Sequence, residues 1–383
     1  MTSLEKDTSL NKNIHVLQLV SGDLWAGAEV MLYTLAKTLH TELNTRVTVV
    51  VLNTGTLEQK LRGCGVTVFV LDESKLNSLQ IFSQLFKIIK EIQPDVLHSH
   101  RLKENIIGSI AAWYRHRIPS IRTVHGASEH RPPIYKLPKH IIPLLNWFCG
   151  RFLQRCIIAV SNDLAKKLSN NFPKSKIKVI ENGVDIDALL ESVETHTVTE
   201  NDVYHIGIAG RLTPVKRVDL FIECAVHLKH NHPELDIHFH IYGEGPLRAT
   251  LTEQVNSVQA NAYIHFEGHT ENIPQQLQTL NALLMTSDHE GLPMILLEAM
   301  CMKTPIIAHA VGGIPELLDH GKCGTLVNTH TSEAFAQAIT KLILQTEKHR
   351  TKAERAFSRV IDRFSAKHTA NVYLDRYKKV IRT

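Results

Sequence analysis

Short apolar segments alternate with amphipathic segments of helical periodicity along most of this chain, and this alternation limits the folds that it can adopt. The first apolar segment covers residues 14–20 and is followed by a helical pattern over 28–39. Apolar segments of strand length recur at 47–52 and 66–70, and another helical pattern follows at 76–92. Strands that alternate with helices form a mostly parallel sheet with helices on both faces. The chain is therefore predicted to be an α/β protein.

The alternation is interrupted once, which divides the chain into two parts. Residues from about 185 to 203 lose periodicity and become polar, and a strand pattern resumes at 204–209. A chain of 383 residues is long enough for two domains of ordinary size. We therefore expect two doubly wound domains, over residues 1–187 and 188–364, and an amphipathic helix over 365–383.

Composition and charge exclude several classes of protein. The net charge of +5 is modest for this length and there is no arginine-rich run, so no nucleic acid is expected as a partner. Residues 1–13 are polar, and no apolar run approaches the roughly 20 residues of a membrane-spanning helix. The six scattered cysteines suit reduced thiols in the cytosol. We expect a cytoplasmic protein that is attached at most to the inner face of a membrane.

Residues 281–298 predict a strand, a short loop and the start of a helix. An apolar strand pattern comes first, and the turn-forming residues after it end at Gly291. The helix is expected to begin at Pro293, which places Glu290 in the loop and Glu298 on the helix. The free N–H groups of a first helical turn attract anions, and two flanking carboxylates can hold the hydroxyl groups of a sugar. The structural alternative is two surface carboxylates on an ordinary strand–helix unit.

A basic segment directly follows the first strand of the second half. Residues 210–217 read Gly-Arg-Leu-Thr-Pro-Val-Lys-Arg, which places Arg211 and Lys216 at the C-terminal edge of the sheet. A guanidinium group can bind two phosphate oxygens at once, and an ammonium group adds a point charge, so the pair suits a diphosphate. Arg217 is expected to face solvent. The alternative for the whole segment is a solvated basic loop.

Two further patterns indicate other chemistry but are incomplete. Residues 243–246 read Gly-Glu-Gly-Pro after a strand, yet the third glycine of a dinucleotide-binding fingerprint is missing. Asp185 and Asp187 form an Asp-x-Asp pair near the expected linker, where we interpret them as structural. No His-Glu-x-x-His or Cys-x-x-Cys motif occurs, and no metal site is expected.

Taken in order, these motifs resemble those of the retaining glycosyltransferases of family four. The acid, seven residues, acid spacing of Glu290 and Glu298 is similar to the signature of that family. Other segments resemble its motifs in sequence order: Ala26-Gly-Ala-Glu, His125-Gly126, Glu181-Asn-Gly-Val-Asp, Gly210-Arg-Leu…Lys216, Gly243-Glu-Gly-Pro, Phe266-Glu-Gly-His and Gly312-Gly-Ile-Pro-Glu. The sequence departs from the family pattern at Trp25-Ala-Gly, where many members have Gly-Gly. This difference affects only which detailed backbone contacts that loop can make.

The resemblance implies an α/β fold of the GT-B type, with two doubly wound Rossmann-like domains facing a cleft. The N-terminal domain over 1–187 would bind the acceptor, and the C-terminal domain over 188–364 would bind the nucleotide sugar. The helix over 365–383 would cross back to the N-terminal domain. The implied activity is that of a hexosyltransferase-type enzyme that retains the configuration of the sugar.

The same resemblance assigns roles to individual residues. Arg211 and Lys216 would hold the diphosphate, Glu298 the ribose hydroxyls and Glu290 the sugar hydroxyls. His125 would hydrogen-bond the sugar or help to orient the acceptor. The catalytic candidates are Glu290, His125, Arg211 and Lys216. Backbone and base contacts add to the donor-binding candidates: Gly27, Gly268, His269, Thr270, Gly291, Leu292, Pro293, Met294 and Glu298. No metal is expected, and no cofactor beyond the nucleotide-diphosphate sugar as co-substrate.

The acceptor is expected to be a glycan or a lipid-linked molecule of envelope or exopolysaccharide synthesis. Residues 131–155 mix apolar anchors with basic side chains, as segments in a membrane interface do. The alternative is a loop beside the cleft followed by a core helix. Two other functions stay open: a nucleotide-sugar epimerase of the same fold, and a non-catalytic nucleotide-sugar binding module.

Overall fold

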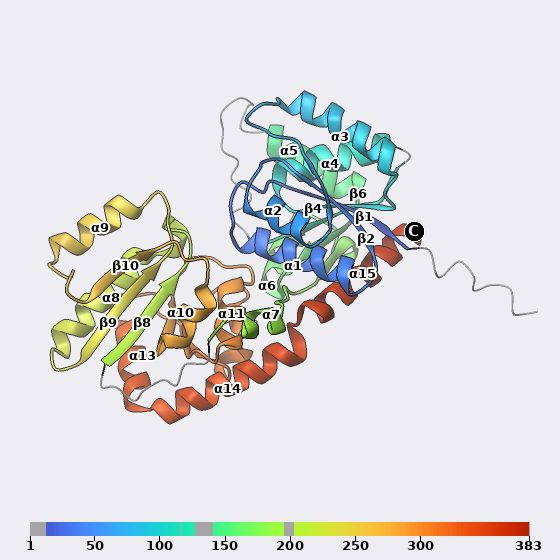
Figure 1. Ribbon diagram of the computed structural model, residues 1–383. Coiled ribbons are helices and arrows are strands. Elements are labelled where there is room, and N and C mark those ends of the chain that lie inside the picture. Colours follow the sequence, from blue (N-terminus) through green and yellow to red (C-terminus); the bar gives the residue numbers. More distant parts are fainter. Residues whose placement is uncertain (1–12, 116, 127–140, 195–202, 383) are drawn as a thin grey trace, which may run out of the picture. The chain divides into compact units, whose positions relative to one another are not determined.

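The computed structural model describes residues 13–115, 117–126, 141–194 and 203–382 (Figure 1). Internal contacts divide the chain into two compact units. Unit 1 comprises Met1–Val160, Ala165–Ile180 and Lys367–Thr383, and unit 2 comprises Ser161–Leu164 and Glu181–Ala366. Each unit contains one parallel sheet, so the predicted doubly wound α/β class is confirmed.

Unit 1 is built on a seven-stranded parallel sheet with the order β3-β2-β1-β4-β5-β6-β7. Its strands are β1 (His15–Val20), β2 (Arg46–Val51), β3 (Thr67–Val70), β4 (Val96–Ser99), β5 (Ser120–Val124), β6 (Gln154–Ala159) and β7 (Ile177–Val179). Its longer helices are α1 (Gly27–Thr41), α2 (Thr56–Gly63), α3 (Ser78–Ile92), α4 (Leu102–Tyr114), α5 (Ile141–Phe148), α6 (Asn162–Leu168) and α15 (Ala366–Arg382). Two short helical turns complete it, η3 (Cys149–Leu153) and η4 (Lys174–Lys176). The central strands are buried on both faces, as continuous runs of Val, Leu and Ile predict.

Unit 2 is built on a six-stranded parallel sheet with the order β10-β9-β8-β11-β12-β13. Its strands are β8 (Val203–Ala209), β9 (Asp236–Tyr242), β10 (Ile264–Gly268), β11 (Ala282–Met285), β12 (Ile306–His309) and β13 (Thr325–Val327). Its helices are α7 (Ile186–Glu191), α8 (Val218–Asn231), α9 (Arg248–Ser257), α10 (Ile273–Thr279), α11 (Met294–Cys301), α12 (Ile314–Leu317), α13 (Ser332–Leu344) and α14 (Thr346–Arg363). The short turns are η5 (Pro214–Lys216) and η6 (Asp319–Gly321).

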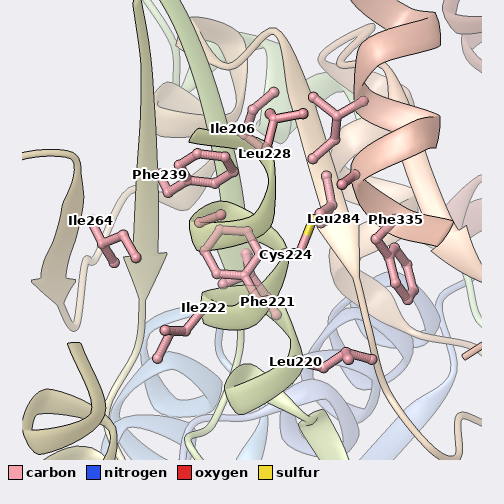
Figure 2. Close-up of a cluster of buried hydrophobic side chains, with 14 of the residues drawn as sticks. Ile206, Leu220, Phe221, Ile222, Cys224, Leu228, Phe239, Ile264, Leu284 and Phe335 are labelled. Atoms are coloured by element: carbon pink, nitrogen blue, oxygen red, sulfur yellow. The ribbon is translucent and has the colours of Figure 1, made fainter. Parts of the chain in front are cut away.

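The core of unit 2 forms around α8, which packs with α9 and α13 (Figure 1). Phe221, Cys224 and Leu228 recur at helical spacing on one face of α8 and are fully buried. Figure 2 shows them beside Phe239 of β9 and Leu284 of β11. Burying side chains of this size contributes about 1.5–3 kcal/mol each, so this face holds α8 and its N-terminal segment firmly against the sheet.

The structure contains several short helices that the periodicity did not predict, among them α7 and α2. α7 lies inside the segment that was expected to be a linker, and Asp185 begins it by accepting a hydrogen bond from the N–H of Ala188 at 3.2 Å. The prediction of an irregular linker from 185 onward is therefore wrong. Six residues are too few for helical periodicity to be recognised. The aspartate cap at Asp185 is, in contrast, a local signal for the start of a helix. α2, between the second and third strands, was missed for the same reason of length.

The final helix α15 contributes two fully buried tyrosines to unit 1. The hydroxyl of Tyr377 lies 2.8 Å from Nδ1 of His98, and the hydroxyl of Tyr373 lies 2.9 Å from Oγ1 of Thr123. His98 Nε2 also contacts Thr123 Oγ1 at 2.8 Å. These bonds attach α15 to β4 and β5. Within the described ranges, no helix combines the length and apolarity needed to span a bilayer.

Candidate active site

The structure brings together two of the predicted catalytic residues of unit 2. Lys216 ends the η5 turn after β8, and Glu290 lies in the loop after β11. Lys216 Nζ lies 2.7 Å from Glu290 Oε1, and the two side chains are 24% and 10% exposed. The strands β8 and β11 are hydrogen-bonded neighbours in a parallel sheet, so their C-terminal loops meet at one edge. The ion pair is therefore a consequence of strand order.

The loop after β11 is bonded to the segment that carries Lys216. Thr286 Oγ1 lies 3.0 Å from the carbonyl oxygen of Lys216 and 2.9 Å from that of Arg217. The N–H of Asp288 donates to the carbonyl of Val215 at 2.9 Å. These hydrogen bonds fix the position of residues 215–217 relative to the loop that carries Glu290.

Two histidines bond to the same loop from the other side. His309, at the end of β12, has Nδ1 2.9 Å from the carbonyl oxygen of Ser287. His330, in the loop after β13, has Nε2 2.6 Å from the carbonyl oxygen of Thr286. The two rings stack at 3.8 Å between centroids with 6° between their planes. Sequence analysis missed both, although His309 ends one strand of the same sheet and His330 lies three residues after another. Their position at the C-terminal ends of strands was the signal that could have found them.

Arg217 does not face solvent as expected, so that prediction is wrong. Its Nε lies 3.0 Å from both carboxylate oxygens of Asp219, and Nη1 lies 3.5 Å from Oδ1 of Asp288. The residue adopts a left-handed backbone at φ 50°, which turns the chain from η5 into α8. By contrast, Arg211 is exposed, and within the described parts of the chain its guanidinium group has no hydrogen-bond or ion partner.

The backbone of Glu290 is fixed by a pair of glycines. A Cβ atom on Gly312 would lie 1.8 Å from the carbonyl oxygen of Glu290, and one on Gly313 would lie 2.2 Å from that of Gly291. The N–H of Gly313 donates to the carbonyl of Gly291 at 3.0 Å. Gly312 also has φ +60°, where glycine is favoured. Only glycines permit this approach of two loops.

The segment that leads from the loop after β11 into α11 contains three of the predicted donor-binding residues, Leu292, Pro293 and Met294. Pro293 is the N-cap and Met294 the first helical residue, one position later than expected. Leu292, Pro293 and Met294 are buried, and the carbonyl of Leu292 accepts a hydrogen bond from Asn182 Nδ2 at 2.8 Å. The N–H groups of a first helical turn carry a partial positive charge that favours an anion.

Glu298 lies one turn further along α11. Burial raises the pKa of its carboxyl group to about 7. Among the described residues no side chain or backbone group bonds to this carboxyl group. A half-buried carboxyl group without an internal partner is costly unless a ligand bonds to it.

The remaining donor-binding candidates of unit 2 lie at the end of β10. Gly268 has φ +74°, and its carbonyl accepts the N–H of Gly243 at 2.6 Å. His269 is exposed and Thr270 is half-buried. The Gly-Glu-Gly pattern at 243–245 has a packing role, because a Cβ on Gly243 would lie 2.1 Å from the carbonyl oxygen of Gly210.

The two candidates of unit 1 follow β1 and β5. Gly27 is the first residue of α1, and His125 follows β5. Nε2 of His125 lies 3.2 Å from Nδ1 of His100, whose Nε2 lies 3.2 Å from Oε1 of Gln18. Burial lowers the pKa of His125 to about 3, so its ring is neutral at pH 7 and acts as a hydrogen-bonding group.

Sequence analysis also missed a buried carboxylate in unit 1. Glu29, in the first turn of α1, is completely buried and forms an ion pair with Arg101, which also bonds Asp23 at 3.0 Å. Burial raises the pKa of Glu29, and Arg101 opposes this shift. Asp185, in contrast, serves as a helix cap, and the described ranges hold no group of three His, Cys, Asp or Glu residues arranged to bind a metal.

Two family models match the chain and together cover most of it. The model described as "Glycosyltransferase Family 4" matches residues 25–188, and the one described as "Glycosyl transferases group 1" matches 204–345. The chain belongs to glycosyltransferase family 4. The predicted GT-B fold and family resemblance are therefore confirmed, and the protein is a glycosyltransferase.

The relatives of this glycosyltransferase include proteins with different names. It is 25% identical to the N-acetyl-alpha-D-glucosaminyl L-malate synthase of Bacillus anthracis, over 79% of this chain and 80% of that protein. It is 24% identical to the Escherichia coli UDP-Gal:alpha-D-GlcNAc-diphosphoundecaprenol alpha-1,3-galactosyltransferase, over 75% and 76%. Its fold matches Anabaena HepE in complex with UDP-glucose at a TM-score of 0.82 and 21% identity, over 96% of this chain and 100% of that one.

Proposed function

We propose that this glycosyltransferase moves a hexose-type sugar, with retention of configuration, from a UDP-sugar to a glycan or lipid-linked acceptor of envelope or exopolysaccharide synthesis. The observation that carries the proposal is the Lys216–Glu290 ion pair beside the first turn of α11. A cation, a carboxylate and free helical N–H groups are the groups that a sugar diphosphate needs. The names of relatives that use or bind UDP-sugars support uracil as the base of the donor nucleotide.

Transfer requires that the diphosphate leave with added negative charge. Lys216 and Arg211 would neutralise this charge together with the N–H groups of Gly291 to Met294. The guanidinium group of Arg211 has no internal partner in the described chain and is available to a phosphate. Because protein cations supply this charge, the reaction needs no metal ion.

The two carboxyl groups would bind different parts of the donor. Glu298 would accept hydrogen bonds from the ribose hydroxyls, which offset the cost of its burial. Glu290 would bind hydroxyls of the transferred sugar, and its ion pair with Lys216 keeps its carboxylate oriented. His125 would act as a neutral hydrogen-bonding group toward the sugar or the acceptor.

A lipid-linked acceptor is supported by the surface of α5 and η3. Leu144, Trp147 and Phe152 are 61%, 40% and 60% exposed. Trp147 and Phe152 pack edge to face at 5.8 Å, so they form a continuous apolar surface. Residues 131–140 of the segment predicted to meet a membrane lie outside the described residues. The surface suits the interface of a membrane that carries the acceptor.

One transfer assay tests the proposal. The protein is incubated with radiolabelled UDP-, GDP- and ADP-sugars and a membrane extract. Label that moves from a UDP-sugar into lipid or polymer supports transfer, whereas an epimerised free sugar supports the epimerase and bound but unchanged donor supports a binding module. Glu290→Gln should abolish the transfer, and Glu253→Gln, at an exposed carboxylate of α9, is the matched control.

Membrane contact is tested separately by flotation with vesicles. A Trp147→Ser, Phe152→Ser double variant should float less than the wild type, because it removes apolar side chains from the interface. Leu79→Ser, at a residue of α3 that is 81% exposed, serves as the control. Equal flotation of the double variant and wild type would contradict membrane contact through this surface.

A further inference from the structure

Unit 1 contains a basic cavity that the proposed glycosyl transfer does not use. It encloses about 480 Å³ and its lining includes Arg155 of β6, Ser175 of η4, Lys178 of β7, and Arg376 and Lys379 of α15. Four of these five residues are cationic, and no carboxylate lines the cavity among the described residues. Cavities of roughly 300–1,000 Å³ are typical of small-molecule sites.

The cavity is separate from the candidate active-site residues of unit 1. Arg155 lies near the N-terminal end of β6, and Ser175 lies just before β7. Gly27 and His125 follow the C-terminal ends of β1 and β5. Because all strands of the sheet are parallel, these two groups of residues lie at opposite edges.

Three of the four cations converge without an internal partner. Within the described parts of the chain, the side chains of Arg155, Lys178 and Arg376 form no hydrogen bond and no ion pair, and Nε of Arg376 is buried without an acceptor. Arg376 and Lys178 both lie close enough to the thiol of Cys156 to oppose the effect of burial, which raises its pKa to about 11. Like charges held close together in this way are stabilised when an anion binds between them.

A purely structural role explains only part of the cluster. Lysines on edge strands prevent pairing with other chains, and β7 is the edge of its sheet. This role accounts for Lys178. It does not account for Arg376 and Lys379, which come from a helix, nor for a buried guanidinium nitrogen without an acceptor.

We propose that this cavity is a binding site for a phosphate-bearing anion, with the guanidinium groups of Arg155 and Arg376, the ammonium groups of Lys178 and Lys379 and the hydroxyl of Ser175 as its donors. Arginine binds two phosphate oxygens through parallel N–H groups, and the two lysines add point charges. The phosphate belongs either to a free phosphorylated molecule or to an anionic lipid headgroup. The inference does not depend on the proposed glycosyl transfer.

Calorimetry with inorganic pyrophosphate and flotation with phosphatidylglycerol vesicles test this site in the full chain. The double variant Lys178→Gln, Arg376→Gln should bind the anion about tenfold or more weakly, since each charge-assisted hydrogen bond contributes at least this factor. Arg62→Gln, at an arginine of α2, is the matched control. UDP affinity should stay unchanged in all variants, which separates this site from the candidate donor site.

Each outcome has a defined meaning. Weaker pyrophosphate binding in the double variant alone identifies a free phosphate ligand. Binding only to phosphatidylglycerol vesicles, and not to phosphatidylcholine vesicles, with loss in the double variant identifies a lipid headgroup. If the double variant does not fold, Lys379→Glu at an exposed position must weaken the same binding. Equal binding by wild type and these variants in both assays overturns the proposal.

Discussion

Lys216 is the residue on which the proposed donor site depends most, because its ammonium group can pair either with Glu290 or with a bound diphosphate. In the structure it pairs with Glu290 at 2.7 Å. A bound diphosphate would compete for the same charge. Arg211 lies three residues before η5, and its guanidinium group, which has no internal partner among the described residues, can help to bind the diphosphate. The site therefore holds its cation in place before the donor arrives, which is a form of electrostatic preorganisation.

Replacing Lys216 tests this reading directly. Lys216→Ala should lower the rate of transfer by roughly 10²–10³, the usual effect of removing one electrostatic donor. Binding of UDP, measured by calorimetry, should weaken far more than binding of uridine, because only UDP carries the diphosphate. Lys229→Ala, in the last turn of α8, is a control for loss of a lysine. Equal UDP affinity in Lys216→Ala and wild type would defeat the assignment.

The two carboxyl groups of the same region should respond differently to substitution. Glu298→Gln should chiefly weaken nucleotide affinity, because its proposed partner is the ribose. Glu290→Gln should chiefly lower kcat, because its proposed partner is the transferred sugar. Measuring UDP affinity and kcat for both variants separates the roles, and a loss confined to nucleotide binding in both would show that the division is wrong.

At the scale of elements, the loop between β11 and α11 is held by three groups of neighbouring residues. The 215–217 segment bonds its backbone through Thr286 and Asp288, and His309 and His330 bond it from β12 and the loop after β13. Gly312 and Gly313 form the third group. A loop held in this way places its carboxylate without an energetic cost during the reaction.

Substitution of a single glycine should disturb this arrangement. Gly312→Ala would place a Cβ 1.8 Å from the carbonyl oxygen of Glu290, so one of the two loops must move. A displacement of about 1 Å at a catalytic group can reduce the rate about 10²-fold. Gly321→Ala is a matched control, because Gly321 also has positive φ, at +97°, but has nothing within 4 Å of the added atom. A kcat for Gly312→Ala similar to that of the control would contradict this account.

At the scale of the whole molecule, unit 1 encloses three histidines that must stay neutral. Burial lowers the pKa of His98 and of His125 to about 3, and that of His100 falls well below its usual value for the same reason. A histidine whose pKa is lowered by folding binds more protons when unfolded. It therefore favours the folded state fully above pH 6.5, and that contribution is lost as the pH falls toward 3.

Acid should thus destabilise unit 1. Between pH 7.5 and 5.0 each of these histidines should reduce the free energy of unfolding by about 2 kcal/mol. Denaturant unfolding at the two pH values measures the loss. His98→Gln should diminish it, because glutamine cannot titrate, whereas His320→Gln at an exposed position should leave it unchanged. A loss of the same size in His98→Gln and wild type would rule out this cause.

Whether the activity requires a metal ion is a property of the whole molecule. Activity should survive excess EDTA, because Lys216 and Arg211 are proposed to neutralise the leaving diphosphate and Asp185 is engaged as the cap of α7. The measurement compares transfer rates before and after chelation. Complete loss of activity that manganese restores would refute the interpretation of the Asp-x-Asp pair.

The sequence alone determined the α/β class, the interruption between two parts and the position of polar residues at strand ends. These features depend on local periodicity and on turn residues, which the chain order displays directly. The predicted positions of Arg211, Lys216 and Glu290 after their strands followed from this alone. The short helix α7 escaped prediction because six residues do not establish a period, and residues 185–191 looked like a polar linker.

Only the tertiary structure decided which of these residues meet. Lys216 and Glu290 are 74 positions apart and pair because β8 and β11 are adjacent, which depends on strand order. The stacking of His309 on His330 and the ion pair of Arg217 with Asp288 have the same origin. So have the bonds of Tyr373 and Tyr377 to strands far away in sequence. Contacts of this kind form when elements from distant parts of the chain pack together. The sequence around one residue therefore does not predict which distant residue will contact it.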